Sequence, residues 1–212
     1  MNDRPHDELA SLPSVRDEQR QLTRRRIVKA ARQVFEQHGY GRASIGDITK
    51  AARVNRATFY LHFTNKAAVF NEVYDTVRQD QSARYWSLLG HALAVGTVQA
   101  VREWLDTTLA WWEDQAPLLP AIHEAMAIDP DVAALWKREL DLLADELHEY
   151  LEHFPQEQRE ERRLRVQLMM VQLDQLCFRV IVQKVFPLDR AALLDLVTGL
   201  WADSLGLVEP GR

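Results

Sequence analysis

Residues 43–66 read ASIGDITKAARVNRATFYLHFTNK and predict two short helices joined by a tight turn. Ser44 is a suitable N-cap for the first helix, and Asp47, three residues later, can complete a capping box. Asn55 is a suitable N-cap for the second helix, which we expect to end at about Phe63. Two short helices separated by so tight a turn are typical of a helix-turn-helix.

The second of these helices has an apolar side and a mixed side. Phe59 and Phe63 are four residues apart and are expected to face the core. The outer face is then formed by Arg56, Ala57, Tyr60 and Leu61. Such a mixture of a cation, a phenol and small apolar groups suits base edges and phosphates in a DNA major groove. The sequence therefore predicts a DNA-binding segment.

The charge of the chain is divided unevenly along its length. The whole chain has a net charge of −5. Residues 1–66 hold 13 basic and 7 acidic side chains, a net charge of +6, whereas residues 67–212 have a net charge of −11. Between Arg20 and Lys66 the balance reaches +9. A basic segment joined to an acidic remainder indicates a nucleic-acid-binding module with a second, different domain.

Other features of the chain argue against membrane and secreted proteins. Cys177 is the only cysteine, so no disulfide can form within the chain. The first residues have no apolar core of a signal peptide, and no run of about 18 apolar residues occurs. We therefore expect a cytoplasmic protein with no membrane partner.

The sequence also lacks the usual signs of an enzyme. Neither a phosphate-binding nor a dinucleotide-binding glycine motif is present. His148 and His153 are five residues apart, a spacing that does not place two metal ligands on one helix face. Cys177 lies among apolar residues and is expected in the core. We expect no catalytic residue, no metal and no cofactor.

Apolar periodicity predicts an all-α fold of about nine helices. Residues 1–21 are expected to form a flexible arm, with Thr23 as N-cap of the first helix. The helices are expected over residues 22–39, 44–52, 55–63, 65–89, 97–114, 117–128, 130–154, 156–186 and 188–205. Gly90 and Gly96 are expected to bracket a loop. This plan gives a three-helix DNA-binding domain over residues 22–66 and a helical ligand-binding and dimerisation domain over residues 67–212.

The run from Gly39 to Phe70, GYGRASIGDITKAARVNRATFYLHFTNKAAVF, resembles the DNA-binding domain of TetR-type transcriptional repressors. The matching positions are Gly39, Tyr40, Ser44, Val54, Thr58, Phe59, Tyr60, His62, Phe63 and Lys66. Two positions depart from the family pattern. Arg53 stands where the family usually has a glycine in a turn that tends towards the left-handed region, and Ala57 replaces a second glycine. Arg53 therefore either tolerates backbone strain or adopts another turn.

The resemblance implies roles for individual residues. Ser44, Tyr60, His62 and Lys66 would contact phosphates, which fixes the register on DNA without reading its sequence. Arg56 would contact a base, most readily guanine, and Ala57 and Leu61 would touch thymine methyl groups. Arg24, Arg25 and Arg26 begin the first predicted helix, where cations are disfavoured, and so suggest an external anion. The full candidate DNA-binding set is Arg24, Ser44, Arg53, Asn55, Arg56, Ala57, Thr58, Tyr60, Leu61, His62 and Lys66.

The C-terminal part is rich in tryptophan. TetR-type repressors hold a small molecule in this domain, and the segments 104–136 and 193–207 resemble the subgroup of the mycobacterial ethionamide-resistance repressor, which has an aromatic tunnel. This resemblance implies a hydrophobic effector. The candidate ligand-binding residues are Trp104, Thr108, Trp111, Trp136, Val171, Asp174, Phe178 and Trp201. The alternative for the tryptophans is ordinary core packing, and for Asp174 it is a salt-bridged core acid.

The last two predicted helices have apolar residues on two faces. One face holds Val166, Met170, Leu173 and Cys177, and the other holds Leu168, Val171, Phe178, Val182 and Val185. The last helix adds Leu193, Leu196 and Leu200, and Leu207 follows it. One face can serve the core and the other a second subunit, so we expect a homodimer on a pseudo-palindromic operator. The family default is a repressor; the alternatives are a ligand-independent DNA-binding protein and a helical interaction protein.

Overall fold

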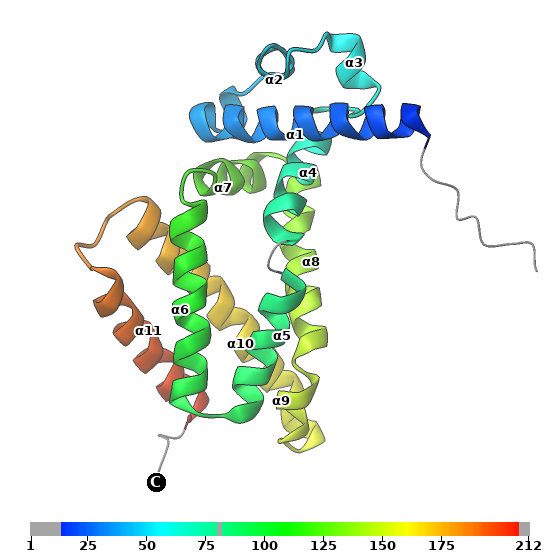
Figure 1. The fold of residues 1–212 in the computed structure, drawn as a ribbon. Helices are drawn as coiled ribbons and strands as arrows, with labels where there is room; N and C mark the ends of the chain where they lie inside the picture. Colours follow the sequence, from blue (N-terminus) through cyan, green and yellow to red (C-terminus); the bar gives the residue numbers. More distant parts are fainter. Residues whose placement is uncertain (1–13, 80–81, 208–212) are drawn as a thin grey trace, which may run out of the picture.

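The computed structural model describes residues 14–79 and 82–207, and the side chains of residues 78–79, 82–85 and 136 lie outside the described part. The fold is all-α, as predicted. Helix α1 lies across one end of the molecule, with α2 and α3 on its outer side, while the longer helices of the C-terminal part run away from it (Figure 1).

The N-terminal part consists of α1 (Val15–Arg42), α2 (Ile45–Ala52) and α3 (Arg56–Tyr60), followed by α4 (Lys66–Gln79). The predicted start of the first helix was wrong. The N-cap is Ser14, whose Oγ accepts a hydrogen bond from the Asp17 N–H, so residues 15–21 are helical. Thr23 lies inside α1, and its hydroxyl donates to the Gln19 carbonyl. The remainder of the predicted flexible arm, residues 1–13, lies outside the described residues.

The C-terminal part begins with α5 (Ser82–Val95), α6 (Val98–Gln115) and α7 (Leu119–Ile128). It continues with α8 (Pro130–Glu146), α9 (His148–Glu152), α10 (Gln156–Cys177), the π-helix η1 (Phe178–Val182) and α11 (Arg190–Leu205). The predicted helices over 130–154 and 156–186 are thus each divided or shortened, and the boundary between α4 and α5, within the predicted helix over 65–89, falls on residues outside the described part. Residues 183–189 connect η1 to α11, and Asp189 caps α11 by accepting a hydrogen bond from the Ala192 N–H.

Gly90 was predicted to begin a loop, but it lies inside α5. A Cβ atom at this position would be 2.2 Å from the carbonyl oxygen of Glu146, at the end of α8. Because so short a contact with backbone is not possible, glycine is required where α5 crosses the end of α8. The other predicted loop glycine, Gly96, has φ +72° and follows α5. The loop therefore begins at Gly96 rather than Gly90.

A cluster of aromatic rings fastens α1 to α4. The Phe35 and Phe70 rings meet edge to face with centroids 5.0 Å apart, and the Tyr40 and Phe70 rings do so at 4.9 Å. All three residues are buried, and burying such rings stabilises the domain through area and edge-to-face contact. The aromatic cluster therefore holds α1 in a fixed position on the helix that leads into the C-terminal part.

Helix α7 is the main contact between the C-terminal part and α1. Arg32 Nη2 donates to Gln115 Oε1 at 3.0 Å, and the Tyr40 hydroxyl donates to the Asp129 carboxylate. The Glu124 carboxylate on α7 lies against the backbone of Gly39 and Gly41. Two hydrogen bonds and the close approach of Glu124 therefore join α1 to α7, to Asp129 directly after it and to the last residue of α6.

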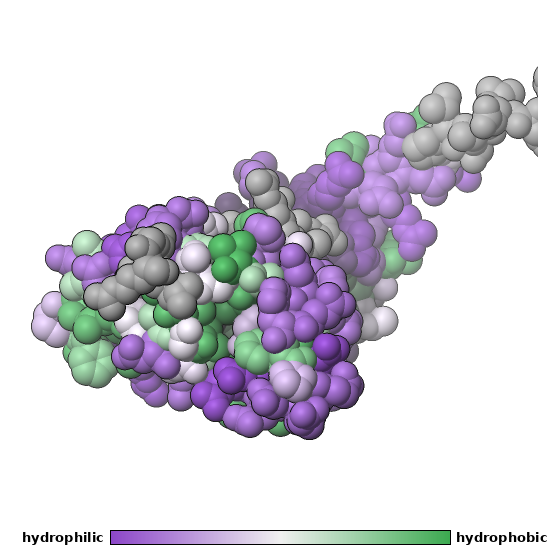
Figure 2. Space-filling model, turned by 90° about the horizontal axis from the view of Figure 1, so that it is seen from below, coloured by the Kyte–Doolittle hydropathy of each residue, from purple (hydrophilic) through white to green (hydrophobic). Residues whose placement is uncertain are grey.

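The surface is divided between apolar and polar regions. Seen from the end opposite α1, hydrophobic side chains gather on the side where α11 lies, whereas the distant N-terminal part is mostly hydrophilic (Figure 2). The exposed apolar side chains of α10 and α11 are Leu164, Leu168, Val171, Leu196 and Leu200. Among the described residues, no helix combines the length and the apolarity needed to cross a membrane.

Candidate nucleic-acid interface

Helix α2 begins with the predicted capping box. The Asp47 N–H donates to Ser44 Oγ at 3.2 Å, and the Ser44 N–H donates to Asp47 Oδ2 at 3.1 Å. The Ser44 hydroxyl also donates to Asp47 Oδ2 at 2.6 Å. These hydrogen bonds favour the carboxylate and lower the pKa of Asp47. Ser44 is exposed, so its contact with a phosphate stays a prediction, but its hydroxyl proton is already used in the cap.

The turn between α2 and α3 passes through the left-handed region at Arg53, with φ 52° and ψ 47°. Of the two possibilities that the sequence left open, the backbone adopts the strained one. The strain is compensated by hydrogen bonds from the Arg53 N–H to the Lys50 carbonyl and from the Val54 N–H to the Thr49 carbonyl. The Arg53 side chain remains exposed.

Helix α3 presents the predicted outer face. Arg56, Ala57, Tyr60 and Leu61 are all exposed, with Leu61 at 72 %, while Phe59 and Phe63 are buried. The helix is shorter than predicted and ends at Tyr60. Its N-cap is Asn55, whose Oδ1 accepts the Thr58 N–H at 2.7 Å. Asn55 and Thr58 therefore fix the start of the helix, and the exposed side chains beyond them form the candidate interface.

Two predicted phosphate contacts are occupied by the protein itself. Arg24 donates to both carboxylate oxygens of Glu72 and to the His62 carbonyl, and its guanidinium lies over the Phe63 ring. Lys66 Nζ donates to the carbonyls of Tyr40, at 2.8 Å, and Ala43, at 3.2 Å. Both cations are half-buried and tie helices together. Their direct contact with DNA stays a prediction, and these internal contacts argue against it.

His62 lies between the domain interior and the outer face. Burial is the main cause that lowers the pKa of His62, followed by the positive charges of Arg20 and Arg24. Its imidazole is therefore mainly neutral at pH 7. It can donate or accept a hydrogen bond at a phosphate but adds no charge there.

Arg20 is a residue that the sequence analysis missed. It is exposed, and its charge acts on His62 near the end of α3. Arg16, Arg20 and Arg24 are spaced by four residues on α1 and so share one face. That spacing was visible in the sequence. It was overlooked because residues 1–21 were predicted to be a flexible arm rather than the start of α1.

The tryptophans of α6 and α11 are packed against each other. The Trp104 and Trp201 rings have centroids 5.3 Å apart, and both residues are only 4 % exposed. Thr108 is buried, and its hydroxyl donates to the Trp104 carbonyl. Trp111 is half-buried and meets Trp112 edge to face. The structure therefore uses these residues in the core, and a ligand role for them stays a prediction.

The other candidate ligand residues are dispersed. Asp174 Oδ1 lies 3.7 Å from His123 Nε2, and the His123 ring stacks on Phe178 with centroids 3.9 Å apart. Val171 is exposed on α10, and the side chain of Trp136, on α8, lies outside the described residues. Asp174 and Phe178 both contact His123, a histidine that the sequence analysis did not select.

Burial dominates the ionisation of this small cluster. It raises the pKa of Asp174 to about 6 and lowers the pKa of His123, with Arg179 adding to the latter. The close approach of the two groups would favour an ion pair, but the cost of burying both charges outweighs that attraction. Burial also raises the pKa of the Cys177 thiol to about 12, in agreement with its predicted place in the core.

Comparison with known proteins gives two levels of similarity. Residues 27–73 match the model of the family "Bacterial regulatory proteins, tetR family". The chain is 40% identical over 52 residues to the probable acrEF/envCD operon repressor of Escherichia coli, which is 24% of each chain. It is 36% identical over 62 residues to the transcriptional regulator TtgR of Pseudomonas putida, covering 29% of this chain and 30% of that one. The chain therefore aligns with about a quarter to a third of the length of these curated relatives.

The similarity of fold extends much further along the chain. A putative TetR-family transcriptional regulator from Mesorhizobium loti superimposes with a TM-score of 0.65 at 17% identity, covering 88% of this chain and 96% of that one. The fatty acid degradation regulator FadR from Bacillus halodurans gives a TM-score of 0.62 at 24% identity, covering 87% and 95%. At such identities the likeness concerns the fold alone. The chain is therefore similar to TetR-family regulators in sequence over residues 27–73 and in fold over most of its length.

Proposed function

We propose that this protein is a homodimeric transcriptional regulator that binds a pseudo-palindromic DNA operator through α3. The observation that carries this proposal is the exposed face of α3, with Arg56, Ala57, Tyr60 and Leu61 projecting from a basic domain. The left-handed turn after α2 and the Asn55 cap fix the start of α3, so its side chains are presented in a defined register. A fixed helix with a cation near its first turn suits direct reading of bases.

The second element of the proposal is the dimer. Leu168 on α10 and Leu196 and Leu200 on α11 are 65 %, 55 % and 61 % exposed. Large exposed apolar side chains on these two helices are expected to be covered by another protein surface. A two-fold axis there would place two copies of α3 on half-sites about 34–36 Å apart, which is one turn of DNA.

The third element is control by a small molecule. We propose that the protein represses transcription and leaves its operator when a hydrophobic effector binds the C-terminal part. The contacts of Arg32, Tyr40 and Glu124 support this, because they connect α1 directly to α7 and its neighbouring residues. An effector changes operator affinity only if it binds the two conformations with different affinity.

An operator selection from random DNA, followed by titration with the selected site, tests the proposal. Arg56→Ala is expected to lower affinity for the selected site by about 1–3 kcal/mol and to leave binding to random DNA less affected. Arg138→Ala on α8 is the matched control, since it removes an exposed arginine outside the N-terminal domain. An equal loss on both DNAs would show that Arg56 contacts only phosphates, and failure to select any site would overturn the proposal.

Leu168→Glu and Leu200→Glu test the dimer. Each variant is expected to sediment as a monomer and to lose operator affinity. Leu142→Glu, at a 40 % exposed leucine of α8, is the control and should remain dimeric. If both interface variants stayed dimeric, the subunits would associate elsewhere.

A further inference from the structure

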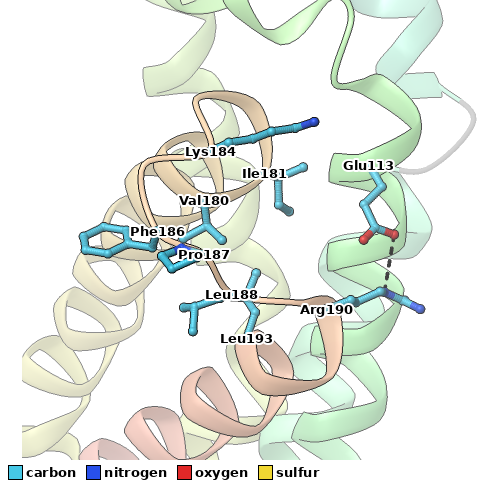
Figure 3. A pocket seen from close by; sticks show the side chains of 9 residues that line it. All are labelled: Glu113, Val180, Ile181, Lys184, Phe186, Pro187, Leu188, Arg190 and Leu193. Carbon is cyan, nitrogen blue, oxygen red and sulfur yellow. Dashed lines mark ion pairs between the residues drawn. The ribbon is translucent and has the colours of Figure 1, made fainter.

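A pocket of about 410 Å³ lies between the end of α6, the π-helix η1 and the start of α11. Its apolar lining includes Val180 and Ile181 of η1 and Leu193 of α11, with Phe186 and Leu188 from the connecting segment (Figure 3). Val180 and Leu193 are buried, whereas Phe186 is 52 % exposed. The pocket therefore has an apolar floor and an open side, and its size falls within the range of small-molecule sites, about 300–1,000 Å³.

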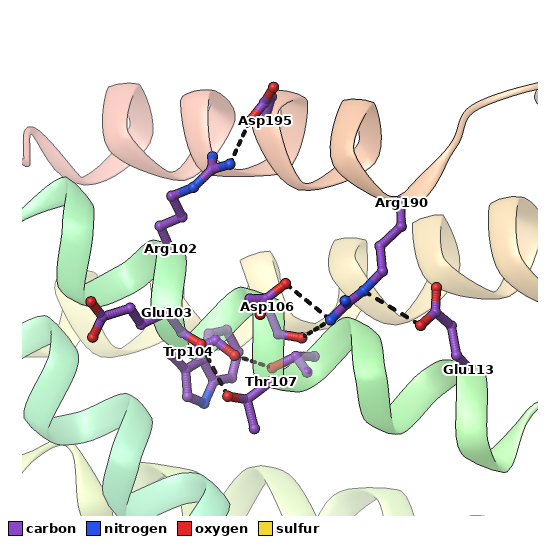
Figure 4. A network of polar contacts seen from close by, with 9 residues as sticks. Arg102, Glu103, Trp104, Asp106, Thr107, Glu113, Arg190 and Asp195 are labelled. Carbon is purple, nitrogen blue, oxygen red and sulfur yellow. Dashed lines mark hydrogen bonds and ion pairs between the residues drawn. The ribbon is translucent and has the colours of Figure 1, made fainter.

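Three charged residues border this pocket, but two of them neutralise each other. Arg190 Nε lies 3.4 Å from Glu113 Oε2, and Arg190 Nη2 lies 2.9 Å from Asp106 Oδ1 and donates to the Asp106 carbonyl (Figures 3 and 4). Farther along the same pair of helices, Arg102 pairs with Asp195 at 2.7 Å (Figure 4). These ion pairs hold α11 on α6, and they leave Arg190 with two carboxylates as partners.

Lys184 is the remaining charge at the pocket. Its side chain extends over Ile181 towards the side where α6 lies (Figure 3), and among the described residues its ammonium group has no hydrogen bond or ion pair. An anionic group placed beside it would form a charge-assisted hydrogen bond with this ammonium group. An apolar molecule with one anionic group therefore matches both the apolar floor of the pocket and the cation at its edge.

The backbone at Lys184 is strained. Its φ is 53°, in the left-handed region where a residue with a side chain is uncommon. It lies two residues after the π-helix, between the Gln183 N–H, which donates to the Phe178 carbonyl, and the Val185 N–H, which donates to the Arg179 carbonyl, both at 3.0 Å. π-helical turns and left-handed side-chain residues occur frequently at functional sites.

The same π-helix also contacts helix α7. Phe178 stacks on His123 of α7 with ring centroids 3.9 Å apart and an interplanar angle of 17°. The next residue, Glu124, lies against the backbone of Gly39 and Gly41 in α1. A shift of η1 caused by a molecule on Val180 and Ile181 would thus act on α7, and through α7 on the candidate DNA-binding domain.

We propose that this pocket is the effector site, and that it takes an amphipathic anion whose apolar body lies on Val180, Ile181 and Leu193 and whose anionic group pairs with Lys184. The inference rests on the proposed function and deepens it. It places the effector at the pocket beside η1 instead of among the tryptophans of α6 and α11.

Calorimetric titration of the full chain with matched probes tests the site. The probes are decanoate and 4-butylbenzoate, each compared with its uncharged amide. At least one carboxylate is expected to bind about two- to fivefold more tightly than its amide, the size of effect typical of an exposed ion pair. Lys184→Gln should abolish this preference, whereas Lys137→Gln, at an exposed lysine of α8, should preserve it. The proposal is overturned if no probe binds, or if carboxylate and amide bind alike.

A second variant tests the position of the apolar body. Ile181→Trp fills the pocket from a half-buried position and should abolish binding of both members of each probe pair, with an unchanged circular dichroism spectrum and sedimentation coefficient. If the variant instead altered the oligomeric state and left probe affinity unchanged, the pocket would be a contact between subunits and the proposal would fail.

Operator affinity measured with and without the probe tests the coupling. Saturating carboxylate should weaken operator binding of the wild type at least severalfold. Phe178→Ala should still bind the probe but lose most of this effect. If the probe left the operator affinity of the wild type unchanged, the effector role would be overturned, but the proposal of DNA binding would stand. Absence of any operator binding would instead overturn the proposed function, and calorimetry would still decide the pocket.

Discussion

The guanidinium of Arg24 holds both oxygens of the Glu72 carboxylate, with Nε 3.0 Å from Oε1 and Nη2 2.7 Å from Oε2. Its third nitrogen donates to the His62 carbonyl at 2.7 Å. Helix α1 is thereby fastened to α4 and to the segment that follows α3. Arg24 thus serves the candidate interface by positioning helices, whereas its neighbour Arg20, one turn away, remains exposed.

Replacing the two arginines is expected to separate these roles. Arg24→Ala should lower the free energy of unfolding by about 1 kcal/mol, because the lost ion pair is only partly buried, and should leave the salt dependence of operator binding unchanged. Arg20→Ala should leave stability unchanged and reduce the slope of log affinity against log salt by about 0.9 for each lost phosphate contact. Urea unfolding and operator titration at several salt concentrations measure both. A reduced salt slope for Arg24→Ala would show that it contacts DNA after all.

Arg53→Gly is expected to affect stability and DNA affinity in opposite directions. Glycine removes the left-handed strain at φ 52°, so the free energy of unfolding should rise by about 1 kcal/mol. The variant also loses an exposed cation beside α3, so operator affinity should fall. Arg53→Asn is the control for charge, since asparagine tolerates the left-handed region and should lower affinity to the same extent. A destabilised glycine variant would contradict this account of the turn.

Trp104→Ala is expected to destabilise the protein by about 3–5 kcal/mol, since its ring is buried against Trp201. Trp111→Ala, at a half-buried ring of the same helix, should cost less. Thermal unfolding of the two variants provides the comparison. If Trp104→Ala kept its stability and lost only its response to effector, the tryptophans would line a ligand site as the sequence suggested.

The buried carboxyl Asp174 is expected to make stability depend on pH. The folded pKa of about 6 lies above the ordinary value of 3.8, so between these values the folded state binds more protons than the unfolded state. This contribution therefore favours folding at low pH and is lost as the pH rises through 6. Asp174→Asn should remove the dependence and raise the free energy of unfolding at pH 7 by about 2–3 kcal/mol relative to the wild type.

The measurement is urea unfolding of both proteins at pH 4.5, 5.5 and 7. His123 contributes in the opposite sense, because its lowered pKa favours folding as the pH rises. His123→Gln in both backgrounds therefore isolates Asp174. The free energies of unfolding of the wild type and the variant should differ by an amount that depends on pH. A difference that stayed constant from pH 4.5 to 7 would contradict the assigned burial of the carboxyl.

Gly90→Ala is expected to destabilise the protein by about 3 kcal/mol, because its new methyl group would clash with the Glu146 carbonyl. Gly199→Ala is the matched control: it lies in α11 and would meet no atom within 4 Å. That variant should gain up to about 1 kcal/mol from helix propensity. Chemical unfolding of the two alanine variants is the test, and a Gly90 variant as stable as the wild type would show that α5 and α8 separate easily.

The sequence was sufficient for features that depend on neighbouring residues. Ser44 and Asn55 cap the predicted helices, because capping uses side chains within three residues of each other. The outer face of α3 was also predicted correctly from the spacing of Phe59 and Phe63. Here local chemistry alone decided both the structure and the exposure of the candidate site.

Features that depend on distant residues could not be predicted in this way. Arg24 and Lys66 were assigned to phosphates, but their partners Glu72 and Tyr40 lie 48 and 26 residues away. The place of Gly90 depends on how closely two helices approach. An apolar stripe of tryptophans has the same spacing in a packed core and in a ligand tunnel.

The contacts of Tyr40 and Arg32 with Asp129 and Gln115 have a consequence for protein engineering. A chimeric regulator that joined residues 1–66 to the C-terminal domain of another protein would keep the aromatic cluster only if Phe70 were also retained. It would still leave the tyrosine hydroxyl and the arginine without their acceptors. Under the proposed function, such a chimera would keep operator binding but transmit effector binding poorly, unless the recipient domain supplied an acidic residue and an amide at the same two places.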